Sequence, residues 1–510
     1  MTAIDNVSLA QRVYTVEQVQ KGEKPAAEAC SISMMQLMSA AGAAVFKHLQ
    51  QDVKAPAKIA VCCGEGNNGG DGYIIARLAQ EAGYQVDVFA LSPNKTISSK
   101  TDNNAERARL AWRDSGGQEK AVNDCEPQRY DIVVDALFGV GLNRALEGAA
   151  AALVQTLNEA SAKVLAVDVP SGLNADTGSV PGVAVHACKT VCLVAHKRGL
   201  LTGKAKNHVG QLVLEDLGIG DAFAKQNKAT YVRVTTEHIQ NWLPRRQPCE
   251  HKGDNGHVLI VGGQPGMSGA VVLAMQAALR CGAGKVSVAC HPEVQAMVAA
   301  AQPEAMVRAV SSQKDLQAMM EQANVIALGP GLGQSDWSRE AFSWVADHCI
   351  NTNKAWVIDA DGLNILAAHE QKERLGLRVI LTPHPGEAAR LLNIDSNKVE
   401  SDRFSALNAL RDNYEAQILL KGAGSLVTSD AGQFILDAGS PAMASGGMGD
   451  LLTGLVSGLV AQGMPETEAV VAAGIWHGRA GELAGNEGER GTLASDLLPY
   501  IRQLVNGKIT

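Results

Sequence analysis

The 510-residue chain has few aromatic residues, 4% in all, and no excess of basic residues. Its formal net charge is -8, and the only basic clusters are two Lys/Arg or Arg/Arg pairs, so we expect no nucleic-acid partner. No apolar run reaches membrane-spanning length, and residues 1–6 have neither the basic start nor the apolar stretch of a signal peptide. The sequence therefore predicts a cytoplasmic protein with no membrane partner.

The ten cysteines form no Cys-x-x-Cys pair, and the twelve histidines have no zinc-finger spacing. Cys62, Cys188 and Cys192 are expected inside apolar strands. We interpret them as small core residues in a reducing compartment. A zinc site is therefore not expected.

The residues that are abundant point to α/β domains. Hydrophobic residues make up 46% of the chain and glycines number 52, so the core must be built from Ala, Val, Leu and Ile. That composition is typical of buried parallel sheets. The length favours two large domains, and the polar stretch at residues 225–228 places the boundary between residues 1–227 and 228–510. We expect each domain to be a separate three-layer αβα sandwich, since no internal repeat relates the two halves.

The first half begins with a predicted helix over residues 8–51, followed by an apolar strand at 58–63, a glycine-rich loop at 64–72 and a helix. This order is the phosphate-binding beginning of a doubly wound, Rossmann-like sheet. The glycines alone would also fit a tight turn. The helix carries a methionine-rich stripe, which fits a core or a subunit contact, and we expect a homo-oligomer.

Two acidic residues follow apolar strands in the same half. Asp135 ends the strand at 130–134 and Asp168 ends the strand at 163–167, and each precedes a glycine-rich loop. Because the carboxyl ends of parallel strands share one crevice, these residues should meet Asn68 and Ser171 there. Carboxylate, hydroxyl and amide oxygens suit a hard cation. Either Asp alone could instead cap the next helix.

These motifs, residues 64–72 and Val-Asp-Val-Pro-Ser-Gly at 167–172, closely resemble NAD(P)H-hydrate epimerase over roughly residues 10–220. The resemblance implies potassium held by Asn68, Asp135 and Ser171, and Asp168 as the carboxylate that acts on the substrate. It places the substrate at Asn67, Asn68, Gly69, Gly70, Asp71, Gly139, Val140, Gly141, Leu142, Asn143, Arg144, Ala145 and Asp168. The expected reaction returns a hydroxyl to either face of the ring carbon beside the nicotinamide nitrogen.

The second half contains one loop with unusual chemistry, Gly-Gly-Met-Gly-Asp-Leu-Leu-Thr-Gly at residues 446–454, which precedes an apolar helical pattern. Exposed backbone N–H groups and the start of a helix form an anion site. Asp450 in that site is a candidate base for a hydroxyl that attacks a phosphoryl group. The alternative is an Asp that only caps the helix.

Other glycine, acidic or basic loops of this half also follow predicted strands at 257–261, 325–328, 356–358, 379–381 and 417–420. Taken singly, each has a structural explanation. Asp359 or Asp361 could cap a helix, His384 could be structural, and Lys421 could be a solvated charge. Together they predict a site along one edge of the sheet.

The second half resembles the ribokinase-like fold, and more narrowly ADP-dependent NAD(P)H-hydrate dehydratase over roughly residues 230–505. The match rests on Lys252–Gly253, residues 256–263, 329–333 and 384–387, and residues 446–450. It implies Asp450 as base, and Mg²⁺ accompanying ADP. It places the hydrate at Ala270, Gly331, Gly333, His384 and Asp450, and the adenine nucleotide at Lys421, Gly422, Ala423, Gly424, Ser425 and Gly449.

The sequence thus predicts a fused repair enzyme for hydrated NADH and NADPH. The first domain would interconvert the two epimers, and the second would dehydrate the S form with ADP, giving AMP and phosphate. The rival interpretation is a ribokinase-like kinase for a small vitamin precursor, with a non-catalytic N-terminal binding domain.

Overall fold

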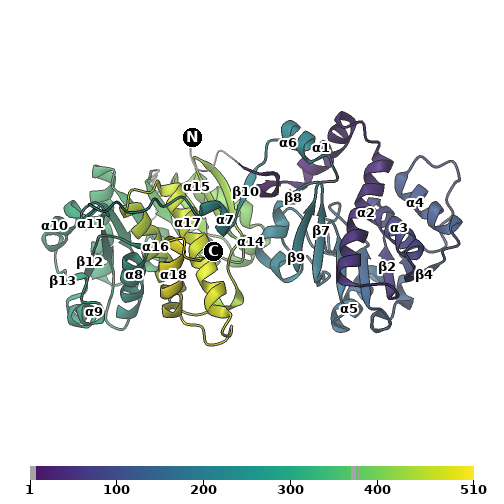
Figure 1. The fold of residues 1–510 in the computed structure, drawn as a ribbon. Helices are drawn as coiled ribbons and strands as arrows, with labels where there is room; N and C mark the ends of the chain where they lie inside the picture. Colours follow the sequence, from purple (N-terminus) through teal and green to yellow (C-terminus); the bar gives the residue numbers. More distant parts are fainter. Residues whose placement is uncertain (1–6, 369–374, 377, 510) are drawn as a thin grey trace. The chain divides into compact units, whose positions relative to one another are not determined.

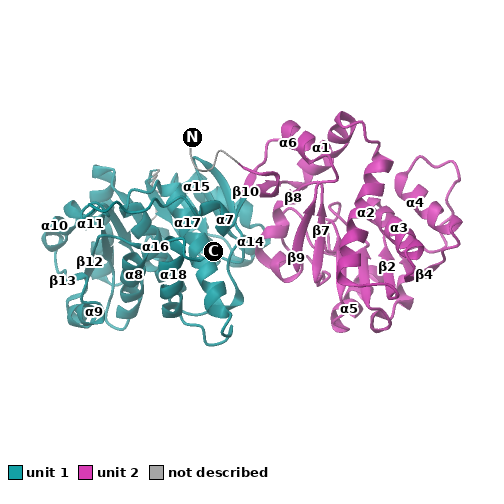
Figure 2. Ribbon diagram, viewed as in Figure 1, with its two compact units in different colours: residues 1–6, 233–510 teal, residues 7–232 magenta. Residues whose placement is uncertain are grey.

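The computed structural model describes residues 7–368, 375–376 and 378–509. The chain divides into two compact units between Val232 and Arg233, close to the predicted boundary after residue 227 (Figure 2). The N-terminal unit is Val7–Val232, and the C-terminal unit contains Arg233–Thr510. Residues 1–6, on which the prediction about a signal peptide rests, lie outside the described residues.

The N-terminal unit is built on a seven-stranded parallel sheet in the order β4-β3-β2-β5-β6-β7-β9. Counted along the chain, this is the 3-2-1-4-5-6 order of a doubly wound sheet with one strand added, and its switch point lies between β2 and β5. The elements are β1 (Arg12–Tyr14), α1 (Val16–Ala29), α2 (Met34–Asp52), β2 (Lys58–Cys63), α3 (Asn67–Glu81), β3 (Gln85–Ala90), α4 (Asn104–Asp114), β4 (Glu119–Ala121), β5 (Ile132–Ala136), α5 (Gly148–Glu159), β6 (Val164–Val167), β7 (Lys189–Leu193), β8 (His196–Lys197), β9 (Gln211–Glu215), α6 (Gly220–Gln226) and β10 (Tyr231–Val234).

Helices cover both faces of this sheet. One core cluster joins α2, α3 and α4 to the sheet through residues such as Val45, Ile75 and Trp112. A second cluster joins α5 to the sheet, for example through Leu153 and Leu157. Alternate strand residues belong to the two clusters, as expected for a three-layer sandwich.

The C-terminal unit repeats this strand order. Figure 1 shows its helices and strands in teal, green and yellow. Its sheet runs β13-β12-β11-β14-β15-β16-β17, all parallel, and continues into the antiparallel strands β18 and β19. The central strands β11, β14 and β15 are buried at every position, so both faces of the sheet are covered. The strands are β11 (His257–Val261), β12 (Lys285–Cys290), β13 (Met306–Ala309), β14 (Val325–Leu328), β15 (Ala355–Ile358), β16 (Val379–Leu381), β17 (Gln417–Leu420), β18 (Ser425–Ser429) and β19 (Gly432–Leu436).

Two apolar helices, α8 and α16, pack against each other and against the centre of this sheet. The two helices approach each other closely at Gly454 of α16, where an added Cβ would lie 2.0 Å from the carbonyl oxygen of Ala274 in α8. Only glycine fits at this position. The helices of the unit are α7 (Thr236–Ile239), α8 (Ser268–Cys281), α9 (Gln295–Ala301), α10 (Gln313–Gln322), α11 (Asp336–Thr352), α12 (Ala360–Ala368), α13 (Pro385–Leu392), α14 (Ser396–Ser401), α15 (Arg403–Tyr414), α16 (Met448–Ala461), α17 (Glu466–Gly485) and α18 (Leu497–Val505).

The structure corrects three local predictions. Residues 8–51 are not one helix, because the strand β1 precedes α1 and a break separates α1 from α2. The glycine-rich stretch 64–72 is mostly helical, since α3 begins at Asn67. Cys188 is exposed and precedes β7, whereas Cys62 and Cys192 are buried strand residues as predicted, and all ten cysteines are free.

Among the described helices, none is by itself long and apolar enough to cross a membrane. Only α1 and α2 taken together meet the length and composition, as a pair bent by 106°.

Candidate active sites

The N-terminal unit has a cavity of about 670 Å³ at the carboxyl ends of β2, β5 and β6. Most of the predicted substrate residues line it. Gly69, Gly70 and Ala145 are not among the lining residues. The wall includes Asn67, Asn68, Asp71, Gly139, Val140, Gly141, Leu142, Asn143, Arg144 and Asp168, together with Val19, Gln20, Glu23, Glu65 and Lys197, which the sequence analysis did not assign to a site.

The first turn of α3 lies close to the end of β2 because glycine occupies two of its positions. A Cβ at Gly69 would lie 2.0 Å from the carbonyl oxygen of Gly64, and one at Gly70 would lie 2.8 Å from the sulfur of Met38. Side chains there would push the helix away from the strand. The glycines thus bring Asn67, Asn68 and Asp71 to the cavity.

Asp168 follows β6 with a left-handed backbone (φ 64°), which a non-glycine residue adopts at some cost in strain. This turn aims its carboxylate at the buried ammonium of Lys197, and the two form an ion pair. The backbone N–H of Leu193 also donates to Asp168 Oδ1 at 3.0 Å, and Lys197 donates to the carbonyl of Leu193 at 2.7 Å. Burial alone would lower the pKa of Lys197, but the Asp168 carboxylate more than offsets this, and the pKa is raised.

Asp135, Ser171 and Asn68, the predicted cation ligands, come from β5, the loop after β6 and α3. Asp135 is fully buried, accepting hydrogen bonds from Ser171 Oγ at 2.6 Å and the Ser171 N–H at 2.8 Å. Ser171 Oγ also lies 3.3 Å from the carbonyl oxygen of Phe138. Burial raises the pKa of Asp135 to about 6, and the amide nitrogen of Asn68 is buried without a hydrogen-bond partner among the described residues.

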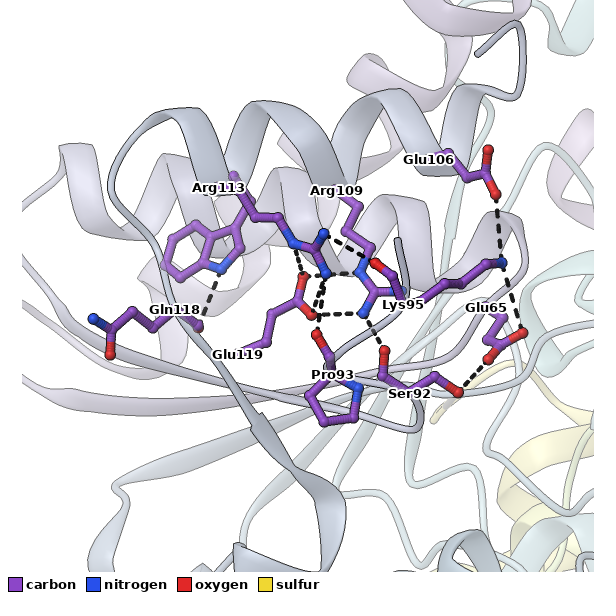
Figure 3. Close-up of polar contacts among 10 residues, drawn as sticks. Glu65, Ser92, Pro93, Lys95, Glu106, Arg109, Arg113, Gln118 and Glu119 are labelled. Atoms are coloured by element: carbon purple, nitrogen blue, oxygen red, sulfur yellow. Dashed lines mark hydrogen bonds and ion pairs between the residues drawn. The ribbon is translucent and has the colours of Figure 1, made fainter. Parts of the chain in front are cut away.

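A polar network holds the segment that follows β3 against this end of the unit (Figure 3). Arg109 and Arg113 of α4 both bind the buried carboxylate of Glu119, at 2.8 Å from Arg109 Nε and 2.9 Å from Arg113 Nε. Arg109 also binds the carbonyl of Ser92, and Ser92 Oγ donates to Glu65, a cavity residue. Arg109 therefore helps to position Glu65 on the cavity wall indirectly, through Ser92.

In the C-terminal unit, α16 begins at Met448 and its N-cap is Gly447, which has a left-handed backbone (φ 89°). A Cβ at Gly447 would lie 2.4 Å from Leu273 Cδ1, so this tight entry to the helix also needs glycine. Asp450 lies in the first turn and is not the cap, which removes the capping alternative. Burial and the neighbouring Asp359 raise the pKa of Asp450 to about 7.

Lys421 lies at the centre of a buried charge cluster and is not a solvated charge. Its ammonium is 2.7 Å from Asp359 Oδ1 and 3.7 Å from Glu387 Oε2. Thr453 Oγ1 of α16 donates to the other oxygen of Asp359 at 2.6 Å. Asp359 therefore ties Lys421 to the helix that carries Asp450, and a Cβ at Gly449 would lie 3.2 Å from Lys421 Nζ.

The remaining predicted residues of this unit lie in the neighbouring strand-end loops. Ala270 lies in the first turn of α8 beside Gly331, where an added Cβ would lie 3.1 Å from the Ala270 Cβ. The N–H of Gly333 donates to Asp361 Oδ2 at 2.8 Å. His384 caps α13, and the loop of Gly422, Ala423, Gly424 and Ser425 closes through a 3.2 Å bond from the Gly422 N–H to Ser425 Oγ.

The sequence analysis missed Lys197, Asp359 as a partner of Lys421, Glu387 and Thr453. Lys197 stands outside the motifs, whereas Asp359, Glu387 and Thr453 lie within or beside them. Each pairs with a residue at least 29 positions away, so no local pattern indicates the pairing. Only the general rule that buried charges are paired would have pointed to them.

Two family models cover the two units. The model described as "YjeF-related protein N-terminus" matches residues 34–199, and the model described as "NAD(P)H-hydrate dehydratase" matches residues 258–503. The bifunctional NAD(P)H-hydrate repair enzyme Nnr of Escherichia coli K12 is 38% identical over 99% of this chain and 96% of its own. That of Coxiella burnetii is 40% identical over 97% of this chain and 99% of its own. The chain belongs to the bifunctional NAD(P)H-hydrate repair enzymes.

Members of the bifunctional repair enzymes also occur outside bacteria, since the Leishmania braziliensis enzyme is 35% identical over 100% of this chain and 96% of its own. Among solved structures, the ADP/ATP-dependent NAD(P)H-hydrate dehydratase from Bacillus subtilis, co-crystallised with ATP/Mg²⁺, is 30% identical over 53% of this chain and 96% of its own, with a TM-score of 0.47. The family names do not favour the rival interpretation, a small-molecule kinase with a non-catalytic N-terminal domain.

Proposed function

We propose that the N-terminal unit, taken as residues 1–227, epimerises hydrated NADH and NADPH, and that residues 228–510 dehydrate the S epimer with ADP. The observation that carries this division is the placement of one candidate acid–base group in each unit. Asp168 lines the cavity of the first unit, and Asp450 lies in the first turn of α16 in the second. Fusion then makes chemical sense, because the second reaction consumes only one epimer.

In the epimerase unit, the Asp168 carboxylate acts on the hydroxyl of the hydrate. The hydroxyl sits on a carbon beside the ring nitrogen, whose lone pair helps the oxygen to leave, and a nearby acid–base group lets it return to either face. Lys197 holds the carboxylate in one orientation, since it binds both Asp168 and the carbonyl of Leu193. Asn67, Asp71 and residues 139–144 bind the rest of the nucleotide.

We assign K⁺ to Asp135, Ser171 and Asn68, and the residues present fit it. Asp135 is a fully buried carboxyl whose bonds come from neutral donors, and the Asn68 amide oxygen, a suitable cation ligand, lies beside the loop after β5, where a Cβ at Gly139 would be 3.3 Å from it. A bound cation would offset the burial of the Asp135 charge and fix the loops after β5 and β6.

In the dehydratase unit, Asp450 takes the proton of the S-hydrate hydroxyl, whose oxygen attacks the terminal phosphorus of ADP as the bond to AMP breaks. Free N–H groups at the start of α16 spread the phosphoryl charge. Phosphate then leaves as the ring nitrogen forms a double bond to carbon, and loss of a ring proton gives NAD(P)H. Lys421 and Gly449 bind the nucleotide phosphates, with residues 422–425 beside them.

Mg²⁺ would reach this site with the phosphates of ADP and neutralise their charge. Within the described residues no group of three or more His, Cys, Asp or Glu side chains is arranged to hold a metal ion. Chelation by EDTA should stop dehydration, and excess Mg²⁺ should restore it.

One experiment tests the whole assignment. The mixed epimers are supplied with ADP and Mg²⁺, and recovery of reduced nicotinamide is followed at 340 nm. Conversion beyond the S fraction, faster than spontaneous exchange, requires the epimerase. A stable phosphorylated alcohol without any signal at 340 nm would instead establish the kinase. Replacing ADP by ATP in the same assay tests the ADP preference.

We also infer a cytoplasmic enzyme, because NADH and NADPH turn over there, and cell fractionation tests this. The homo-oligomer stays a prediction, to be checked by light scattering. The methionines that indicated it pack within the N-terminal unit, since Met38 is a buried core residue and Met35 packs against the same core cluster.

A further inference from the structure

The helix α1 contributes one wall of the epimerase cavity, although it lies outside the residues matched by the N-terminal family model. Val19 and Gln20 are adjacent, and Glu23 follows them by about one helical turn, so the three residues share one face of α1. All three line the cavity. The helix is firmly placed. The N–H of Val16 donates to Asp176 at 2.9 Å, and a Cβ at Gly22 would lie 2.5 Å from the Asn227 side chain of the neighbouring segment.

Glu23 differs from the other acidic residues of α1. Glu17 pairs with Lys21 at 2.5 Å and Glu28 with Lys24 at 3.8 Å, and all four side chains are exposed. Glu23 is partly buried in the cavity wall and makes no hydrogen bond or ion pair with any described residue. A carboxyl group placed in a binding cavity without a protein partner is available to a ligand.

The charges around Glu23 are those of the proposed catalytic group. Burial raises the pKa of Glu23, the nearby Asp168 carboxylate raises it further, and Lys197 opposes both. Asp71 of α3 belongs to the same group, because its pKa is raised by burial and by the charges of Asp168 and Glu23. The cavity thus holds one carboxylate paired with an ammonium, Asp168, and two carboxyl groups on other elements without a partner among the described residues, of which Asp71 is buried and Glu23 is the more accessible to a ligand.

A second acid–base group would assist epimerisation on the face of the ring that Asp168 does not reach. A proton must reach the departing hydroxyl on one face of the ring, and another proton must be taken from the water that adds to the other face. The Asp168 carboxylate is held in one orientation by Lys197, so it is poorly placed to exchange protons on both faces of the nicotinamide ring. We propose that Glu23 is the second acid–base catalytic residue of the epimerase, contacting the hydroxyl on the face that Asp168 does not reach; this rests on the proposed function.

One turnover moves one proton from Glu23 to Asp168, and exchange with solvent water returns it before the next turnover in the same direction. In one direction, protonated Glu23 gives its proton to the hydroxyl, the carbon–oxygen bond breaks, the nitrogen lone pair forms the carbon–nitrogen double bond, and water is released. Water then adds to the other face, the electron pair returns to nitrogen, and the surplus proton goes to Asp168. The opposite epimer uses the two carboxyl groups in reverse order.

The test compares Glu23→Gln with Glu17→Gln, an exposed acid on the same helix, in the full-length protein. With the mixed epimers and excess ADP, the S form gives a fast phase at 340 nm, and epimerisation of the R form gives a slow phase. We expect Glu23→Gln to keep the fast phase and to slow the second phase by about 100-fold or more, with the KM for the R hydrate little changed. Glu17→Gln should behave as the wild type.

A second variant separates proton transfer from structure. In Glu23→Ala, added acetate or formate should restore the slow phase in a concentration-dependent way, because a small carboxylic acid can occupy the space left in the cavity. An unchanged slow phase in Glu23→Gln overturns the proposal, as does a loss explained by an equal rise in KM. A wild-type protein without a slow phase above spontaneous exchange would refute the epimerase function itself, which is a different outcome.

Discussion

The sharpest prediction concerns the pH dependence of dehydration and its link to Asp359. As a base, Asp450 must be ionised, and its pKa is raised to about 7 by burial, then by the charge of Asp359, against the opposing charge of Lys421. A single group with that pKa is about one-tenth ionised at pH 6 and about nine-tenths at pH 8. Hence kcat/KM should rise about eight- to tenfold over this interval, and this parameter reports the free enzyme, which is the state described above.

ADP itself complicates that result, because a terminal phosphate ionises near pH 6 and could produce a similar rise. The Asp359→Asn variant distinguishes the two sources. It removes a negative charge that raises the pKa of Asp450, and it frees Lys421, whose charge lowers that pKa. Both changes act in the same direction, so the midpoint should move to lower pH by about one unit. The ionisation of ADP in solution is unaffected by the substitution.

The assay uses the purified S hydrate and ADP, both well below their KM, with excess Mg²⁺ and constant ionic strength from pH 5.5 to 8.5, and reduced nicotinamide is measured at 340 nm. Asp450→Asn is the companion variant, and it should bind ADP normally by calorimetry while losing about 10²- to 10⁴-fold in turnover. Identical midpoints for the wild type and Asp359→Asn, or a normally active Asp450→Asn, would show that Asp450 is not the base.

Four further outcomes are expected. Asp168→Asn should abolish epimer exchange, measured by chromatography of the R and S forms, while dehydration of the S form continues at its normal rate. Asp135→Asn should remove the dependence of exchange on K⁺, seen when K⁺ is replaced by a large organic cation; a variant that still responds to K⁺ would refute the assigned site. Gly449→Ala places a methyl group 3.2 Å from Lys421 Nζ, so it should weaken ADP binding about tenfold or more without affecting exchange. Lys197→Met leaves the Asp168 carboxylate without its buried partner and should lower the free energy of unfolding by about 3–5 kcal/mol in a urea titration.

The strands were the most predictable part of the fold. The limits predicted for β2, β11, β14, β16 and β17 agree with the structure. These strands are buried on both faces, so they appear in the sequence as short continuous apolar runs bounded by glycine, proline or acidic residues. Their order also placed the candidate residues at one edge of each sheet, because the carboxyl ends of parallel strands lie together.

The helix start within the glycine-rich segment 64–72 was less predictable. Glycine ordinarily disfavours a helix interior, so Gly69 and Gly70 indicated a loop. The structure shows that they begin a helix, because the close approach to Gly64 and Met38 leaves no space for side chains. The need for glycine at these positions arises from tertiary contacts, which helix propensities do not describe. The same limit hid Lys197, since nothing in its local sequence indicates that it pairs with Asp168.

Comparing the two units shows how one sheet design supports two different reactions. In both, an Asp directly follows the fifth strand of the parallel sheet in chain order, β6 or β15, and pairs with a buried lysine from a later strand end. In the N-terminal unit the strand-end Asp168 itself lines the cavity, so it is available to the substrate. In the C-terminal unit Asp359 is bound by Thr453 as well as by Lys421 and is only 1% exposed. Asp359 therefore holds the lysine beside Gly449, and the base that we propose is Asp450 in the first turn of α16. In the proposed mechanisms a helix supplies a second carboxyl group in both units, Glu23 of α1 near Lys197 and Asp450 of α16 near Lys421, and the units differ in whether the strand-end Asp itself is open to the substrate.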